Sequence, residues 1–163
     1  MNNRNSPPKF LVFLDFDGVL HSLEANEFEK FRPEAIHSVN RILDELEATV
    51  VLSTAWRMDF GIEKFNAWFK DRIIDSTPVH ELNLQKEHLR FHEIMDFLKN
   101  REWLHVPWIA IDDKRSHFPA SSPAYITDAK IGITSKDTDN IILIGQSMKF
   151  AQRSLLRHIS RRG

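Results

Sequence analysis

The sequence predicts an α/β fold in which a central, mainly parallel sheet lies between two layers of helices. Three short runs of apolar and β-branched residues, at 10–14, 49–52 and 106–111, suit strands, and each is followed by polar side chains. Runs without polar alternation are typical of strands that are buried on both faces. Segments with helical periodicity separate the runs, and this alternation indicates βαβ units.

The first half of the chain predicts two strands and the helix between them. The strands are expected at Phe10–Leu14 and Thr49–Leu52. Pro33 suits the first turn of a helix, where its missing N–H is not needed. Apolar residues then recur at the helical period and predict a buried face that consists of Ala35, Ile36, Val39, Ile42, Leu43 and Leu46.

The second half continues the alternation. We expect helices over 56–72, 86–100 and about 138–159, a strand that ends at Asp112, and a last strand over 124–127. Residues 73–78 suit a short strand or an extended connector. The apolar stripes are Ile62, Phe65, Trp68 and Phe69 in the first of these helices, and Leu89, Ile94, Phe97 and Leu98 in the second.

Polar residues follow each of the three main strands. They are Asp15 and Asp17, Ser53 and Thr54, and Asp112 and Asp113. Ligands of parallel α/β sheets bind at the carboxyl ends of the strands, so these side chains are expected to converge. Neighbouring carboxylates repel one another unless a proton or cation lies between them, and Mg²⁺ prefers such oxygen ligands. The pattern therefore predicts a Mg²⁺ site.

These motifs resemble, in this order, those of the haloacid dehalogenase-like (HAD) phosphohydrolase superfamily. The similar segments are Asp15-Phe16-Asp17-Gly18-Val19-Leu20-His21, Ser53-Thr54-Ala55-Trp56-Arg57, Leu89-Arg90-Phe91-His92-Glu93-Ile94, and the strand that ends at Asp112-Asp113. The resemblance covers about residues 9–135 and looks most like small HAD domains with a Ser-x-x-Trp-Arg motif, some of which occur in RNA-repair proteins. It implies a three-layer, Rossmann-like fold and a Mg²⁺-dependent phosphatase.

The resemblance also implies roles for single residues. Asp15 would be the nucleophile that forms an aspartyl-phosphate, and Asp17 would be the general acid and base. Ser53 and Arg90 would hold the phosphoryl group. Asp15, Asp17 through its carbonyl, Asp112 and Asp113 would hold the metal.

Three assignments leave alternatives open. Thr54 competes with Ser53 for the phosphoryl oxygen, and either hydroxyl could instead cap the following helix. Lys86 lies one helical turn before Arg90 and is the rival cation. Arg57 is expected near the mouth of the site, where it could touch substrate.

Composition and charge bear on the number of domains, the class of partner and the cellular location. The 163 residues suit one domain, predicted at 9–163 after a flexible leader at 1–8. A net charge of −1 favours neither nucleic acid nor a membrane, although the basic C-terminus leaves a nucleic-acid contact open. The absence of cysteine excludes disulfides and fits a cytoplasmic location.

The leading function prediction is a phosphomonoester hydrolase. The alternatives are a nucleic-acid end-processing phosphatase or phosphotransferase, and a non-enzymatic binding module. The segments between the motifs are short, so no separate cap domain is expected over the site, only a short flap at Ser22–Phe31. Such an open site would admit a phosphorylated macromolecule.

Overall fold

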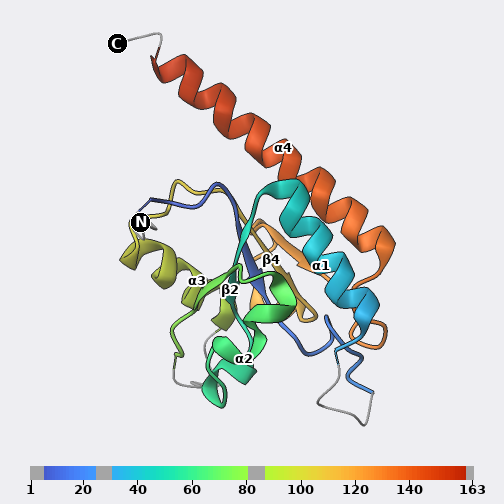
Figure 1. Ribbon diagram of the computed structural model, residues 1–163. Helices are drawn as coiled ribbons and strands as arrows, with labels where there is room; N and C mark the ends of the chain where they lie inside the picture. The colour runs from blue at the N-terminus through green and yellow to red at the C-terminus, as the bar shows by residue number, and fades with distance from the viewer. Residues whose placement is uncertain (1–5, 25–30, 81–86, 161–163) are drawn as a thin grey trace.

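The computed structural model describes residues 6–24, 31–80 and 87–160 (Figure 1). Five strands form one sheet in the order β3-β2-β1-β4-β5, and all four strand pairings are parallel. The strands are β1 (Leu11–Leu14), β2 (Thr49–Leu52), β3 (Ile73–Ser76), β4 (Trp108–Asp112) and β5 (Ala124–Ile126). The predicted parallel sheet is confirmed, and residues 73–76 form its edge strand.

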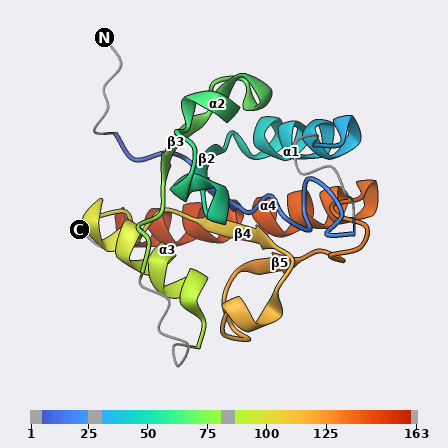
Figure 2. The same ribbon diagram turned by 90° about the horizontal axis from the view of Figure 1, so that it is seen from below.

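Helices cover both faces of the sheet (Figure 2). Alternate β1 residues Val12 and Leu14 face a core shared with α1 (Pro33–Leu46), α2 (Glu63–Asn66) and α4 (Ser135–Ser160). Leu11 and Phe13 point to the other face, where they pack with α3 (Leu89–Asn100). Three 3₁₀ segments complete the helices: η1 (Ala55–Met58), η2 (Ala67–Phe69) and η3 (Arg115–His117). The predicted three-layer, Rossmann-like fold is confirmed.

The register of the sheet sets the level of the strand ends. Leu14 pairs with Leu52 of β2 on one side and with Ile111 of β4 on the other. The next residue of each strand, Asp15, Ser53 or Asp112, therefore emerges at the same edge. The ladder continues through these residues, because Asp15 N–H donates to Ile111 O at 3.0 Å and Ser53 N–H donates to Leu14 O at 2.9 Å.

The prediction of one continuous helix over residues 56–72 is wrong. Residues 56–72 form η1, α2 and η2 instead of one long helix. Lys70 and Asp71 both adopt left-handed φ angles, 53° and 56°, which end the helical path. The broken chain lets Phe65 and Phe69 reach the core, while Trp68 of the predicted buried stripe remains 41% exposed. Tertiary packing of aromatic side chains has overridden the helical period here.

Two predicted helix starts are also displaced. The helix expected from Lys86 begins at Leu89, because His88 lies in the left-handed region at φ 60°, ψ 40°, and Leu89 itself is only half-buried. The C-terminal helix begins at Ser135, three residues earlier than predicted. There Thr134 and Asp137 cap each other: Thr134 N–H donates to Asp137 Oδ2 at 2.8 Å, and Asp137 N–H donates to Thr134 Oγ1 at 3.2 Å.

No helix among the described residues is long and apolar enough to cross a membrane. The last turns of α4 extend beyond the rest of the structure (Figure 1). The described ranges hold one sheet and its helices, with no second domain over the edge where β1 ends. Residues 1–5 of the predicted leader and 25–30 of the predicted flap lie outside the described residues, so the leader, the flap and the domain boundaries stay predictions.

Candidate active site at the carboxyl edge of the sheet

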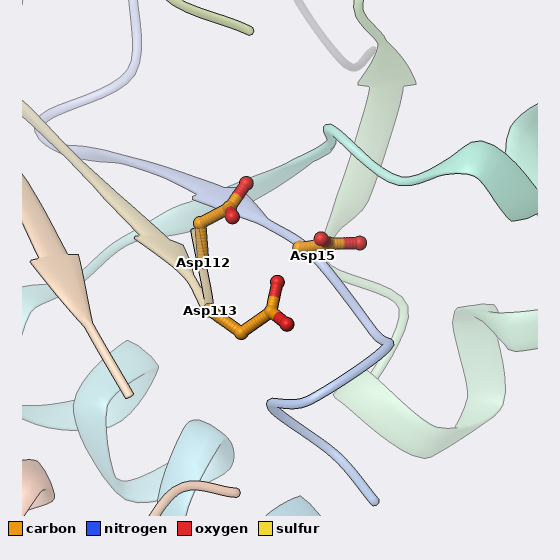
Figure 3. Close-up of side chains that lie close together, drawn as sticks. All are labelled: Asp15, Asp112 and Asp113. Carbon is orange, nitrogen blue, oxygen red and sulfur yellow. The ribbon is translucent and has the colours of Figure 1, made fainter. Parts of the chain in front are cut away.

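Three carboxylates meet where β1 and β4 end (Figure 3). Asp15, Asp112 and Asp113 each offer an oxygen that lies within 4.8 Å of the others. Asp15 and Asp112 are buried, at 5% and 1% exposure, and Asp113 is half-buried. The two elements are neighbours in the sheet although nearly a hundred residues separate them in the chain, so the cluster depends on the parallel pairing of β1 with β4.

The ionised form of this cluster is unfavourable without a cation. Burial, and next the charge of Asp112, raise the pKa of Asp15 to about 8 from its usual 3.8, against the opposing effects of Arg90, the Phe16 N–H and the Thr54 hydroxyl. Burial and Asp112 also raise the pKa of Asp113. These carboxylates therefore fit a hard divalent cation, which would favour their charged forms.

Asp17 is held separately, with its carboxylate turned toward an aromatic group. Trp56 Nε1 donates to Asp17 Oδ1 at 2.9 Å, and His21 Nε2 lies 3.0 Å from the same oxygen. The Asp17 side chain is 33% exposed, so solvent and substrate can reach it. The indole N–H of Trp56 and the ring of His21 hold the same oxygen of this carboxylate, which leaves its other oxygen available for proton transfer.

The turn after Asp17 requires a glycine at position 18. Gly18 has φ +69°, and a Cβ on it would lie 2.6 Å from Cβ and Oδ2 of Asp113. Its carbonyl accepts a 2.8 Å hydrogen bond from Thr127 Oγ1, a side chain that follows β5. The close approach of backbone to Asp113 is thus possible only without a side chain.

The two hydroxyls after β2 have different surroundings. Thr54 caps η1, since its Oγ1 accepts from Trp56 N–H at 3.4 Å, and it is fully buried. Ser53 is also buried at 2%, but its Oγ has no hydrogen-bond partner among the described residues. A buried hydroxyl without a partner is costly, and a phosphoryl oxygen at this edge would supply one.

Two arginines share one buried acid beside Asp15. Glu93, which is 1% exposed, accepts on Oε2 from Arg57 Nη2 at 2.8 Å and from Arg90 Nη1 at 3.0 Å. Its Oε1 accepts from the His80 N–H at 3.1 Å. The charge of Arg90 lowers the pKa of Asp15, against the larger effects of burial and of Asp112 that raise it. The rival cation Lys86 lies outside the described residues.

Arg57 lies deeper than the mouth of the site. Its side chain is 3% exposed and donates to the Thr54, Thr77 and Pro78 carbonyls as well as to Glu93. Burial, and next the charge of Arg90, lower its pKa, while Glu93 and Asp15 oppose that shift. Its fixed charge adds to that of Arg90, but most of its donors are already occupied. A direct substrate contact for Arg57 stays a prediction.

Asp112 has its own supports within the loop after β4. Its Oδ1 accepts from the Lys114 N–H at 2.8 Å, and His117 Nδ1 lies 3.2 Å and 3.3 Å from its two oxygens. These groups orient the carboxylate toward Asp15, in the way that outer hydrogen-bond partners orient metal ligands.

Sequence reasoning did not assign Glu93 or the Trp56 indole N–H to the site. The signal for Glu93 was present, because Arg90 and Glu93 are three residues apart in a helix and therefore share a face. No comparable signal links Trp56 to Asp17, which is 39 residues away in the chain. Trp56 is half-buried and packs against the core, and its indole N–H donates to Asp17.

Comparison with known protein families shows a match over most of the chain. The family described as "HAD domain in Swiss Army Knife RNA repair proteins" matches residues 11–138, which include every described residue of the site. No curated protein matches the chain.

Proposed function

This chain belongs to the family of HAD domains in Swiss Army Knife RNA repair proteins, and we propose that it is a Mg²⁺-dependent phosphomonoester hydrolase. Membership of this family supports a phosphatase-like hydrolase in general. The observation that carries the proposal is the buried cluster of Asp15, Asp112 and Asp113 beside two arginines and an unpartnered serine hydroxyl. Such a cluster combines a nucleophile with groups that neutralise and hold a phosphoryl anion.

Asp15, Asp112 and Asp113, with the backbone carbonyl of Asp17, would hold the ion. When bound, Mg²⁺ supplies positive charge that lets an anionic phosphate approach a carboxylate. Arg90 adds a fixed positive charge, and Ser53 Oγ donates the hydrogen bond that it lacks among the described residues.

The reaction would proceed in two steps on this chain's own residues. A carboxylate oxygen of Asp15 attacks phosphorus, the bond from phosphorus to the ester oxygen breaks, and Asp17 gives its proton to the departing alcohol. Asp17 then accepts a proton from water as that water attacks the aspartyl-phosphate, and the bond between phosphorus and Asp15 breaks. Inorganic phosphate leaves, and both carboxyl groups return to their initial states.

The position of Asp17 supports its role. Of these four acids, Asp17 alone stands apart from the acid cluster in the described residues, and its carboxylate accepts from Trp56 Nε1. It is also reachable from solvent, at 33% exposure of its side chain. Both features suit a group that exchanges protons with an alcohol and with water.

A nucleic-acid end-processing phosphatase is the second candidate. It is favoured by the RNA-repair context in the family description and by a site that no second domain covers in the described ranges. A phosphate on a bulky carrier could reach Asp15 without a cap opening. A non-enzymatic binding module is disfavoured, because both Asp15 and Asp17 are present.

The test is turnover of an aryl phosphate with and without Mg²⁺, in the wild type and in Asp15→Asn. The amide is nearly isosteric but cannot attack phosphorus, so turnover should fall at least a thousandfold, a loss of the size seen when a catalytic nucleophile is removed. Glu34→Gln, on the first turn of α1, is the matched control and should keep full activity. Activity of Asp15→Asn within tenfold of the wild type would remove Asp15 from the nucleophile role.

A second pair of variants separates metal binding from proton transfer. Asp113→Ala should raise the Mg²⁺ concentration needed for half-maximal rate, because it removes a negative ligand. Asp17→Asn should leave that concentration nearly unchanged and lower kcat. Wild-type rates for both variants at saturating Mg²⁺ would contradict these assignments.

A further inference from the structure

An aromatic pocket opens directly beside Asp17. It has a volume of about 370 Å³ and is lined by Asp17, Ala55, Trp56, Met58, Asp59, Phe60 and Lys64. A second hollow of about 180 Å³ shares Trp56 and Lys64 with it and adds Phe31, Phe65 and Trp68. Another pocket, of about 690 Å³, instead involves Thr49 at the opposite end of β2 and none of the site acids.

The outer members of this aromatic group are not needed to fill the core. Phe65 is buried at 2%, whereas Phe60, Trp68 and Met58 are 39%, 41% and 59% exposed. The Phe60 ring is held edge-on to Phe65, with ring centroids 6.1 Å apart and planes at 87°. Large apolar side chains that stay exposed together at the rim of a catalytic site indicate a binding surface.

The pocket also holds a cation against an aromatic face. Lys64 Nζ lies 3.4 Å from the centroid of the Phe60 ring. Asp59 lies in the same lining, so the pocket offers flat apolar faces with one positive and one negative group. Flat faces suit a planar ring, and the charged groups suit the polar edges that such a ring would carry.

Because the pocket lies beside Asp17, the group that occupies it would be part of the leaving group of the reaction. Asp17 is both a lining residue and the proposed donor of the proton to the departing oxygen. Trp56 joins the two, since its ring lines the pocket while its Nε1 binds Asp17 Oδ1. Whatever remains attached to the departing oxygen therefore lies on the pocket side of Asp17.

We propose that this pocket binds the base of the nucleotide whose phosphate is removed. The proposal rests on the proposed phosphatase function and extends it to the substrate class. Stacking on an aromatic ring requires no particular base, because every base has a π-face. The chain has a net charge of −1 and the pocket lining holds one positive group, Lys64, and one negative group, Asp59, so recognition is confined to the terminal nucleotide and does not follow a long phosphate backbone.

The experiment compares substrates with and without a base. The value of kcat/KM is measured with Mg²⁺ for adenosine 3′-phosphate, adenosine 5′-phosphate and ribose 5-phosphate. The wild type should prefer at least one of the adenosine phosphates by roughly ten- to a hundredfold, the range that stacking of one base provides. The two adenosine arms identify which phosphate position the site accepts.

Variants of Phe60 test the pocket itself. Phe60→Ala should abolish the preference for the adenosine phosphate, and Phe60→Tyr, which restores a ring, should retain it. Phe150→Ala is the matched control, because Phe150 is 76% exposed on α4, outside the pocket lining, and its loss should leave the preference unchanged. A preference that survives in Phe60→Ala overturns the proposal.

Binding separates this proposal from the proposed function. Adenosine phosphates and ribose 5-phosphate are titrated into Asp15→Asn, and tryptophan fluorescence is recorded. Equal affinities overturn the base pocket, whether or not the wild type turns over phosphates. If Asp15→Asn binds the adenosine phosphates more tightly and the wild type turns over none of the phosphates, only the proposed phosphatase function is overturned. A phosphotyrosine peptide that outperforms both adenosine phosphates would also overturn the nucleotide assignment.

Discussion

Neutralising Glu93 is expected to weaken both the fold and the phosphate site. Its carboxylate is the shared acceptor for Arg57 and Arg90, and it also accepts from the His80 backbone. All three charged side chains are largely buried, at 1% for Glu93, 3% for Arg57 and 12% for Arg90. Removing the negative charge would leave two guanidinium groups side by side with little access to water.

The magnitude follows from this burial. Breaking a buried ion pair by removing one partner costs about 3–5 kcal/mol, and we expect Glu93→Ala to fall in that range. Glu93→Gln keeps an oxygen acceptor and should lose about half as much. For a chain of this size, 1 kcal/mol lowers Tm by about 2–4 °C, so Tm should fall by roughly 10 °C for the alanine variant.

Thermal unfolding and kinetics together test this expectation. Asp96→Asn is the control on the same helix, since Asp96 pairs with His80 Nε2 at 2.8 Å but is 45% exposed. Exposed pairs contribute about 0–1 kcal/mol, so its Tm should change by less than about 4 °C. For Glu93→Gln, KM for phosphate esters should rise, because Arg90 loses the partner that orients it. The acid limb of the kcat–pH profile should also move to lower pH, since the freed positive charges favour ionised Asp15.

The reasoning would be refuted by a Glu93→Ala protein that matches Asp96→Asn in Tm. It would also be refuted by a Glu93→Gln protein with wild-type KM and an unmoved pH profile. The first result would mean that the buried charges are compensated elsewhere, and the second that Arg90 does not depend on Glu93 for its position.

Two further predictions concern the acid cluster. Because burial raises the pKa of Asp15 to about 8, the folded metal-free protein keeps a proton that the unfolded chain loses near pH 4. The wild type should therefore lose stability relative to Asp15→Asn as the pH rises from 5 to 8. Thermal melts at each pH should also show that Mg²⁺ raises the wild-type Tm more at pH 8 than at pH 5. A wild-type minus variant difference that is flat with pH would contradict this. Gly18→Ala should raise the Mg²⁺ requirement at least tenfold, because the new Cβ would lie 2.6 Å from Asp113 Oδ2 at a φ of +69°. Gly61→Ala is its control, as the new Cβ would meet only the flexible end of Glu63, and equal Mg²⁺ titrations for the two variants would exclude the steric explanation.

Local sequence was sufficient for the elements whose signals act over a few residues. The helix predicted to have Pro33 in its first turn and an apolar stripe as far as Leu46 spans Pro33–Leu46 in the structure, because the proline and the stripe are both local features. The segment after Trp56 was misjudged for the opposite reason. Its aromatic residues have helical spacing, yet they pack around Phe16 from several short pieces of chain. Contacts that span 40 to 53 residues cannot be seen in a window of helical length.

For the site, the sequence by itself determined the acids and their edge of the sheet. Asp15 and Ser53 each follow a buried strand and Asp112 is the last residue of one, and parallel pairing in register is enough to bring the three together. Only the tertiary structure decided how the other groups serve them. The indole of Trp56 on Asp17, the Glu93 carboxylate between two arginines and the pocket at Phe60 depend on the angles at which separate elements pack. A strand end is specified by residues next to it, whereas a side-chain contact between distant elements is specified by the whole core.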